Sequence, residues 1–195
     1  MAEDKSTYAA SLSIDYPDRD LDRLSTFFRI FFIIPINIIV ALLANQSSGI
    51  VFLPLILMIL FRKKYPIWWF DWNLAMTRFL TRVNVYSSLL TDVYPSTDEE
   101  QSVHIDIRYP DTEKELNRWL PLVKWILVIP HLIVLYCLWI AVVVVCIIAW
   151  FAILFTKRYP RALFDFVVAV YRWGLRVFVY AYLLTTDRYP PFSLE

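Results

Sequence analysis

Residues 125–156 read WILVIPHLIVLYCLWIAVVVVCIIAWFAILFT, and this stretch decides the class of fold. It contains no Asp, Glu, Lys or Arg, and an equally long stretch between Arg29 and Arg62 contains none either. Each run is 32 residues long, whereas a charge-free apolar run of about 18 residues is already long enough to cross a bilayer. The hydrophobic fraction of the whole chain is 59%, against roughly 45–50% in soluble domains. The sequence therefore predicts an integral membrane protein.

The chain also contains an internal repeat. Tyr16-Pro17-Asp18 recurs as Tyr109-Pro110-Asp111, and Lys63-Lys64-Tyr65-Pro66 recurs as Lys157-Arg158-Tyr159-Pro160. Further pairs that match in register are Arg23 and Arg118, Arg29 and Lys124, Pro35 and Pro130, Asp71 and Asp165, Arg78 and Arg172, Arg82 and Arg176, and Tyr86 and Tyr180. Shared hydrophobicity does not explain these matches, because most of the matched residues are polar, Tyr or Pro. We predict two tandem repeats, residues 10–97 and 102–195, joined by an acidic linker at 98–101.

Each apolar run is predicted to form a transmembrane helical hairpin, over about residues 20–62 and 113–156. A single helix formed by one 32-residue charge-free run would measure about 48 Å. The hydrocarbon core is only about 30 Å thick. The first run has a polar break over residues 45–49. The second run has none, so its turn near Leu138 to Val142 is inferred from the repeat alone. A hairpin that dips into the bilayer without crossing it fully is left as an alternative.

Short strands and amphipathic helices are predicted on either side of the hairpins. Apolar and polar residues alternate over 11–16 and again over 102–107, which indicates two strands that pair within one chain or between chains. Residues 66–90 and 160–184 each begin with Pro and predict an amphipathic helix. The expected fold is an all-α integral membrane protein of two repeats, each with a short strand, a transmembrane hairpin and an amphipathic interfacial helix.

The two amphipathic helices carry the candidate binding residues. On a helix, one face within an arc of about 80° would hold Asp71, Arg78, Arg82 and Tyr86, and the second repeat places Asp165, Arg172, Arg176 and Tyr180 in the same way. Arg near the cytoplasmic surface attracts anionic head groups, so this stripe is interpreted as a lipid or partner site. Simple anchoring at the membrane interface is the alternative. A carboxylate gains nothing from anionic lipid, so the two Asp residues are expected to pair with Arg29 or Lys124.

No catalytic, cofactor or metal site is predicted. The chain has two glycines, too few for a Gly-rich phosphate loop, and no Ser–His–Asp, Cys–His or paired-carboxylate arrangement repeats. His131 is interpreted as a core or interface histidine, and Cys137 and Cys146 as buried small hydrophobic residues. The net charge of +1 gives no general attraction to nucleic acid.

Two segments resemble a known family. Residues 154–166, LFTKRYPRALFDF, and residues 186–194, TDRYPPFSL, look like the bacterial membrane-protein family catalogued as domain of unknown function 4389. The resemblance covers both repeats and is most specific in the second, and in that family a Gly often stands where this chain has Lys157. The resemblance implies a bacterial inner-membrane protein and carries over no activity.

The expected function is that of a non-enzymatic inner-membrane protein with several membrane passes. Hairpins would leave every Lys and Arg on one side, and the positive-inside rule then places both termini in the cytoplasm. We expect an oligomeric, accessory or scaffold subunit that binds anionic lipid or a larger membrane complex through its basic interfacial helices. A small oligomeric channel or lipid-transport protein is one alternative, and a membrane-embedded enzyme is another.

Overall fold

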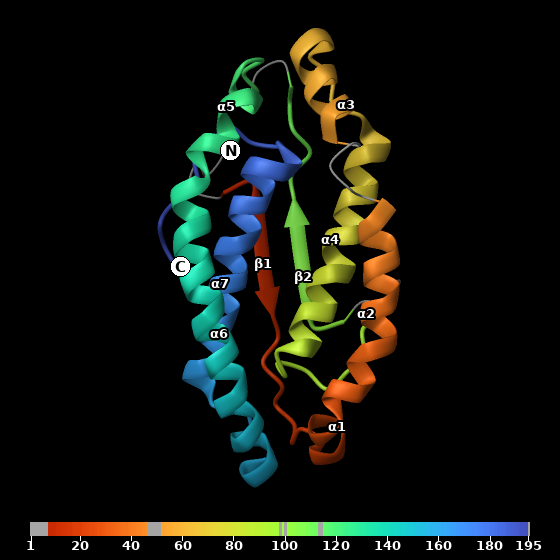
Figure 1. Ribbon diagram of the computed structural model, residues 1–195, viewed down its shortest axis with the longest axis vertical. Coiled ribbons are helices and arrows are strands. Elements are labelled where there is room, and N and C mark those ends of the chain that lie inside the picture. Colours follow the sequence, from red (N-terminus) through yellow and green to blue (C-terminus); the bar gives the residue numbers. More distant parts are fainter. Residues whose placement is uncertain (1–7, 47–51, 98, 100, 113–114, 195) are drawn as a thin grey trace, which may run out of the picture.

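The computed structural model describes residues 8–46, 52–97, 99, 101–112 and 115–194. The chain is mostly helical, and two strands lie at its centre (Figure 1). The elements in chain order are β1 (Ala10–Ile14), α1 (Arg23–Phe27), α2 (Arg29–Gln46), α3 (Phe52–Leu57), the π-helical turn η1 (Met58–Arg62), α4 (Ile67–Ser87), β2 (Val103–Ile107), α5 (Leu120–Leu127), α6 (Ile129–Thr156), α7 (Arg161–Phe178) and the π-helical turn η2 (Val179–Leu183).

The two strands pair with each other within the chain. They form an antiparallel ribbon with Leu12 opposite Ile105 at its centre. Because successive side chains of a strand point to opposite faces, the ribbon has one apolar and one polar face. The buried face carries Ala10, Leu12, Ile14, Val103, Ile105 and Ile107. The exposed face carries Ser11, Ser13, His104 and Asp106.

Helices α4 and α7 cover the buried face of the ribbon. α4 packs against β2 and α7 packs against β1, and Figure 1 shows one helix on either side of the strand pair. Both helices begin directly after an extended proline, Pro66 or Pro160, because the fixed φ of proline suits a helix start and the missing N–H is not needed there. They occupy the segments for which the sequence predicts amphipathic helices.

The second apolar run forms one long helix instead of a hairpin. α6 continues without interruption through Leu138 and Val142, so the turn expected there is not formed. Pro130 stands in its first turn, where proline starts a helix and does not break one. At 28 residues the helix is about 42 Å long. Among the described residues α6 is the one helix long and apolar enough to cross a membrane, and only 17% of its most apolar window is buried.

The first apolar run also extends along the molecule. α2 lies beside α4, whereas α3 lies at the end of the molecule opposite α1 (Figure 1). Part of the polar break expected over 45–49 lies outside the described residues, as do two of the four residues of the linker expected at 98–101. Phe79 and Val83 of α4 pack against Ile36 of α2. The remaining surface of α2 is apolar and exposed, like that of α6.

One hydrophobic core joins the two halves of the chain. Leu12 and Ile105 of the ribbon share it with Ile59 from the first half and with Val167 and Val170 of α7. Tyr65 Oη adds a link across the halves, since it donates a hydrogen bond to Leu183 O at 2.6 Å. The predicted repeats therefore fold as one body around the ribbon.

Candidate functional site

A two-stranded ribbon leaves both outer edges without a neighbouring strand. Asp15 N donates to Ser102 O and Arg108 N donates to Ala9 O, each at 2.9 Å. Hydrogen-bonded and non-hydrogen-bonded pairs alternate along an antiparallel ladder, so Leu12 and Ile105 form a non-hydrogen-bonded pair. Their carbonyl groups consequently point to the two free edges, where unpaired backbone groups invite pairing with other chains.

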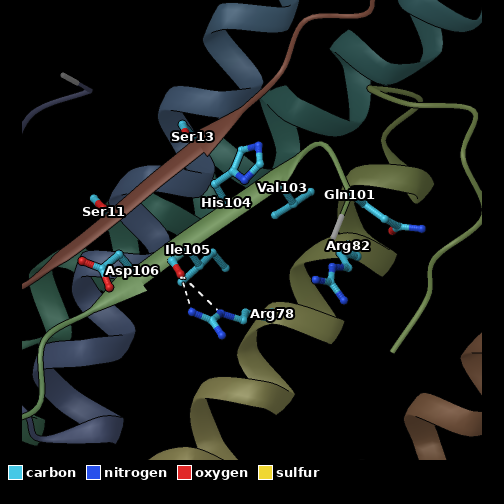
Figure 2. A pocket seen from close by; sticks show the side chains of 9 residues that line it. All are labelled: Ser11, Ser13, Arg78, Arg82, Gln101, Val103, His104, Ile105 and Asp106. Carbon is cyan, nitrogen blue, oxygen red and sulfur yellow. Dashed lines mark hydrogen bonds between the residues drawn. The ribbon is translucent and has the colours of Figure 1, made fainter. Parts of the chain in front are cut away.

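Arg78 and Arg172 occupy these two edges. Arg78 donates to Ile105 O from Nε at 3.3 Å and from Nη2 at 3.1 Å, as the dashed lines in Figure 2 show. Arg172 Nε donates to Leu12 O at 3.2 Å on the other edge. Each arginine therefore satisfies an edge carbonyl with a charge-assisted hydrogen bond. Two of the four arginines predicted to contact lipid head groups therefore bind the central ribbon pair.

Arg82 and Arg176, one helical turn further along α4 and α7, are buried and also bind backbone. Arg82 Nη1 donates to Ser96 O at 2.9 Å and to Thr97 O at 3.1 Å, and Arg176 Nη2 donates to Ser193 O at 3.2 Å. These bonds fix the C-terminal segment of each half of the chain. A guanidinium suits this task because its donors form a rigid, planar fork.

Arg29 and Lys124 hold the chain just after α4 and η2. Arg29 Nη1 donates to Thr91 O at 3.0 Å, and its guanidinium lies 3.8 Å from the Tyr86 ring centre. Lys124 Nζ donates to Thr186 O at 2.7 Å and lies 4.9 Å from the Tyr180 ring centre. Both tyrosines of the predicted stripe are therefore cation–π partners of buried bases.

The structure corrects the expected pairing of Arg29 and Lys124 with Asp71 and Asp165. Lys124 pairs with Asp187, with Nζ 2.7 Å from Oδ1, whereas Asp165 pairs with Arg161 of its own helix at 3.2 Å. Asp71 is exposed. Burial lowers the pKa of the Lys124 ammonium, and Asp187 opposes that shift. A sequence signal for the true partner exists, because Thr91-Asp92 recurs as Thr186-Asp187 at the offset that relates Arg29 to Lys124.

A shallow polar depression lies along β2. Its volume is about 230 Å³, and Figure 2 shows Arg78 and Arg82 approaching it from α4 while His104 and Asp106 project from the strand. His104 Nε2 lies 3.1 Å from Oδ2 of Asp15, the residue that directly follows β1. The exposed face of the ribbon thus presents hydroxyl, imidazole and carboxylate groups together.

Two apolar cavities lie on the helical side of the ribbon. The cavity of about 470 Å³ lies between α4, α6 and α7, and Leu12 of β1 reaches it from the buried face. The cavity of about 650 Å³ lies between the start of α2, the end of α4 and the middle of α6. Asn84, Trp139 and Tyr171 line both cavities. Their walls are mainly hydrocarbon and aromatic, which suits an apolar ligand.

The remaining candidates form no reactive cluster in the described part of the chain. No group of three or more His, Cys, Asp or Glu residues could hold a metal ion there. His131 is fully buried, accepts a hydrogen bond from Trp173 Nε1 at 3.1 Å and stacks on Phe192 at 3.8 Å between ring centres. Cys137 is exposed on α6, which corrects the expectation that both cysteines are buried.

The similarity to a known protein family lies in the second half of the chain. No curated protein and no solved structure gives a significant match. The resemblance expected over both repeats is supported over the second one only. There, residues 119–193, from the start of α5 to the C-terminal segment, are similar to the family described as Domain of unknown function (DUF4389).

Proposed function

We propose that this protein is a non-enzymatic scaffold or accessory subunit of the bacterial inner membrane, built from two tandem repeats, with both termini in the cytoplasm. The exposed apolar surface of α2 and α6 carries the proposal. Soluble monomers rarely expose contiguous apolar patches larger than a few hundred Å². On α6 alone the exposed large hydrophobic residues are Ile129, Leu132, Ile133, Val134, Tyr136, Trp139, Ile140, Val143, Val144, Ile147, Ile148, Phe151 and Phe155.

In this proposal, anionic lipid binds at the ends of the long helices. Exposed basic side chains gather there: Arg19, Arg158 and Arg161 near the end of α6, and Lys64 and Arg118 near the start of α5. Each base close to an anionic surface contributes about 1 kcal/mol. The buried stripe arginines Arg82 and Arg176 are less available, because each would have to leave a backbone carbonyl to reach a head group.

The exposed ribbon face is the proposed contact for a larger complex or another copy of the chain. On this face the backbone, hydroxyl groups and charges of both halves meet at the surface. Polar groups of this kind specify a partner without driving non-specific aggregation.

Reconstitution into vesicles tests the membrane and lipid claims together. We expect the protein to float with vesicles of phosphatidylcholine. In detergent, we expect it to bind phosphatidylglycerol more tightly than phosphatidylcholine. Arg158→Gln/Arg161→Gln should weaken phosphatidylglycerol binding about tenfold, from two lost contacts of about 1 kcal/mol each less salt screening. Arg108→Gln, at the end of the ribbon, is the control and should bind normally. A protein that stays in solution without detergent and floats with neither lipid would refute the proposal.

A small oligomeric channel or lipid-transport protein is the second candidate. The two apolar cavities favour it, because Asn84, Trp139 and Tyr171 border both and could mark one continuous path. Ion flux or lipid scrambling in densely loaded vesicles would support this candidate. Vesicles that remain tight and unscrambled would leave the scaffold role in place.

A further inference from the structure

We propose that the protein lies along a single leaflet, with α2 and α6 among the acyl chains and the exposed ribbon face toward the cytoplasm. This inference rests on the proposed membrane function and names the partner surface of the apolar face: the acyl region of one leaflet. Three features of the fold support it, namely the position of the ribbon, the relation between the two halves, and the distribution of basic residues.

The ribbon lies beside the middle of the long helices. At one end of α6, Leu21 N donates to Lys157 O at 2.8 Å, and at the other end Tyr189 Oη donates to Leu127 O at 3.0 Å. β1 contacts α7 at Arg172, in the interior of that helix, and α7 packs along α6. Figure 1 shows the strands at mid-height between the helices. A perpendicular α6 would therefore hold the ribbon at bilayer depth.

Bilayer depth is unfavourable for this ribbon. Its exposed face carries Ser11, Ser13, His104 and Asp106, and Asp15 lies at its end. A charged group at the bilayer centre costs about 3 kcal/mol or more, and lipid-exposed sheet edges do not occur within the hydrocarbon region. With the long axis in the membrane plane, the same face lies in water while the helical side lies in lipid.

The two halves of the chain are related as this orientation requires. Leu12 and Ile105 are equivalent in the repeat and face each other in the ribbon. Arg172 binds Leu12 O and Arg78 binds Ile105 O, so the halves exchange matched contacts across an antiparallel pair. The axis that relates them runs perpendicular to the ribbon. In a leaflet this axis is the membrane normal, and both halves then meet the lipid at the same depth.

Basic residues lie at both ends of the molecule, not at one. Lys64 and Arg118 belong to one end, and Arg158 and Arg161 belong to the other. A perpendicular orientation would put one of these clusters on the periplasmic side, against the positive-inside rule. Along one leaflet, all four side chains reach the same cytoplasmic head groups. The two apolar cavities, which lie on the helical side of the ribbon, would then be filled by acyl chains.

Cysteine accessibility from each side of the membrane tests the orientation. In a Cys137→Ala/Cys146→Ala background, Arg118→Cys and Arg158→Cys place one thiol at each end of the molecule. We expect a membrane-impermeant maleimide to label neither thiol in intact spheroplasts and both in inverted membrane vesicles. Ile140→Cys, on the exposed side of α6, should remain unlabelled in both preparations. Labelling of either end thiol from the periplasmic side would overturn the inference.

A second readout does not depend on the end variants. A nitroxide at Ser13→Cys on the ribbon should collide with a water-soluble nickel chelate, and one at Ile140→Cys should collide with oxygen instead. Reversed accessibilities would contradict the orientation. A protein that fails to float with any vesicle refutes the proposed function itself, whereas one that floats with its two ends on opposite sides refutes only the leaflet orientation.

Discussion

Replacing Arg82 with Met separates the structural role of the arginine stripe from a lipid-binding role. Arg82 is 8% exposed, and its Nη1 donates to Ser96 O and Thr97 O. A hydrogen bond to a charged group contributes about 1.5–3 kcal/mol. One nitrogen makes both bonds, so the pair does not count twice. Arg82→Met keeps most of the apolar stem and should lower the free energy of unfolding by about 3 kcal/mol.

The expected shift in melting temperature follows from the size of the chain. At this length 1 kcal/mol corresponds to about 2–4 °C, so Arg82→Met should melt about 6–12 °C below the unmodified protein. Thermal unfolding in detergent, followed by near-ultraviolet circular dichroism, measures this change. Arg158→Met is the matched control. Arg158 is exposed, and its Nε lies 3.7 Å from Asp20, so its loss should cost no more than about 0.5 kcal/mol.

Lipid binding by the same variants completes the test. If the carbonyl contacts explain Arg82, the folded fraction of Arg82→Met should bind phosphatidylglycerol as tightly as the unmodified protein. An unchanged melting temperature combined with weaker phosphatidylglycerol binding would refute this reasoning. That outcome would return Arg82 to the head-group role predicted from the sequence.

Three further predictions concern the backbone, the buried ion pair and pH. Lys157 has φ 60°, a left-handed conformation in which Gly is favoured over residues with a Cβ. Lys157→Gly should therefore raise the free energy of unfolding by up to about 1 kcal/mol, whereas Lys157→Ala, which keeps a Cβ, should not. Equal melting temperatures for the two variants would contradict this prediction. Asp187→Asn leaves the fully buried Lys124 ammonium without its carboxylate partner and should lower the free energy of unfolding by about 3 kcal/mol. The double variant Lys124→Met/Asp187→Leu should recover most of this loss. A decrease below about 0.5 kcal/mol in urea unfolding of Asp187→Asn would argue against a stabilising pair. Burial raises the pKa of the Tyr65 phenol above its ordinary value of 10.0, so the unfolded chain loses this proton at a lower pH than the folded chain does. The free energy of unfolding should therefore fall as the pH rises above 10, by up to about 1.4 kcal/mol per pH unit for one tyrosine. Tyr65→Phe should show a shallower fall, and identical slopes for the two proteins would count against this assignment.

Some features of the fold follow from local sequence. Alternation over 11–16 and 102–107 indicates strands, because the side-chain period of a strand is two. Pro66 and Pro160 indicate the starts of α4 and α7 for an equally local reason. The left-handed conformation of Lys157 is local as well, since helices commonly end with a residue in this region.

The hairpin prediction failed because it depended on an assumption about orientation. It compared a helix length with the thickness of a bilayer and assumed a perpendicular crossing. Nothing in residues 138–142 interrupts a helix, and α6 runs straight through them. Hydropathy measures how apolar a helix is, and it carries no information on the direction in which that helix lies.

By itself, the sequence determined that the chain carries two long charge-free apolar runs, that many of its residues recur in register, and where its strands and amphipathic helices lie. The tertiary structure decided what the charges do. An Arg that binds a lipid phosphate and an Arg that binds an edge carbonyl give the same helical periodicity, because periodicity defines a face and not what that face meets. Only the pairing of β1 with β2, between residues 89 to 97 positions apart, creates the edges that Arg78 and Arg172 cover.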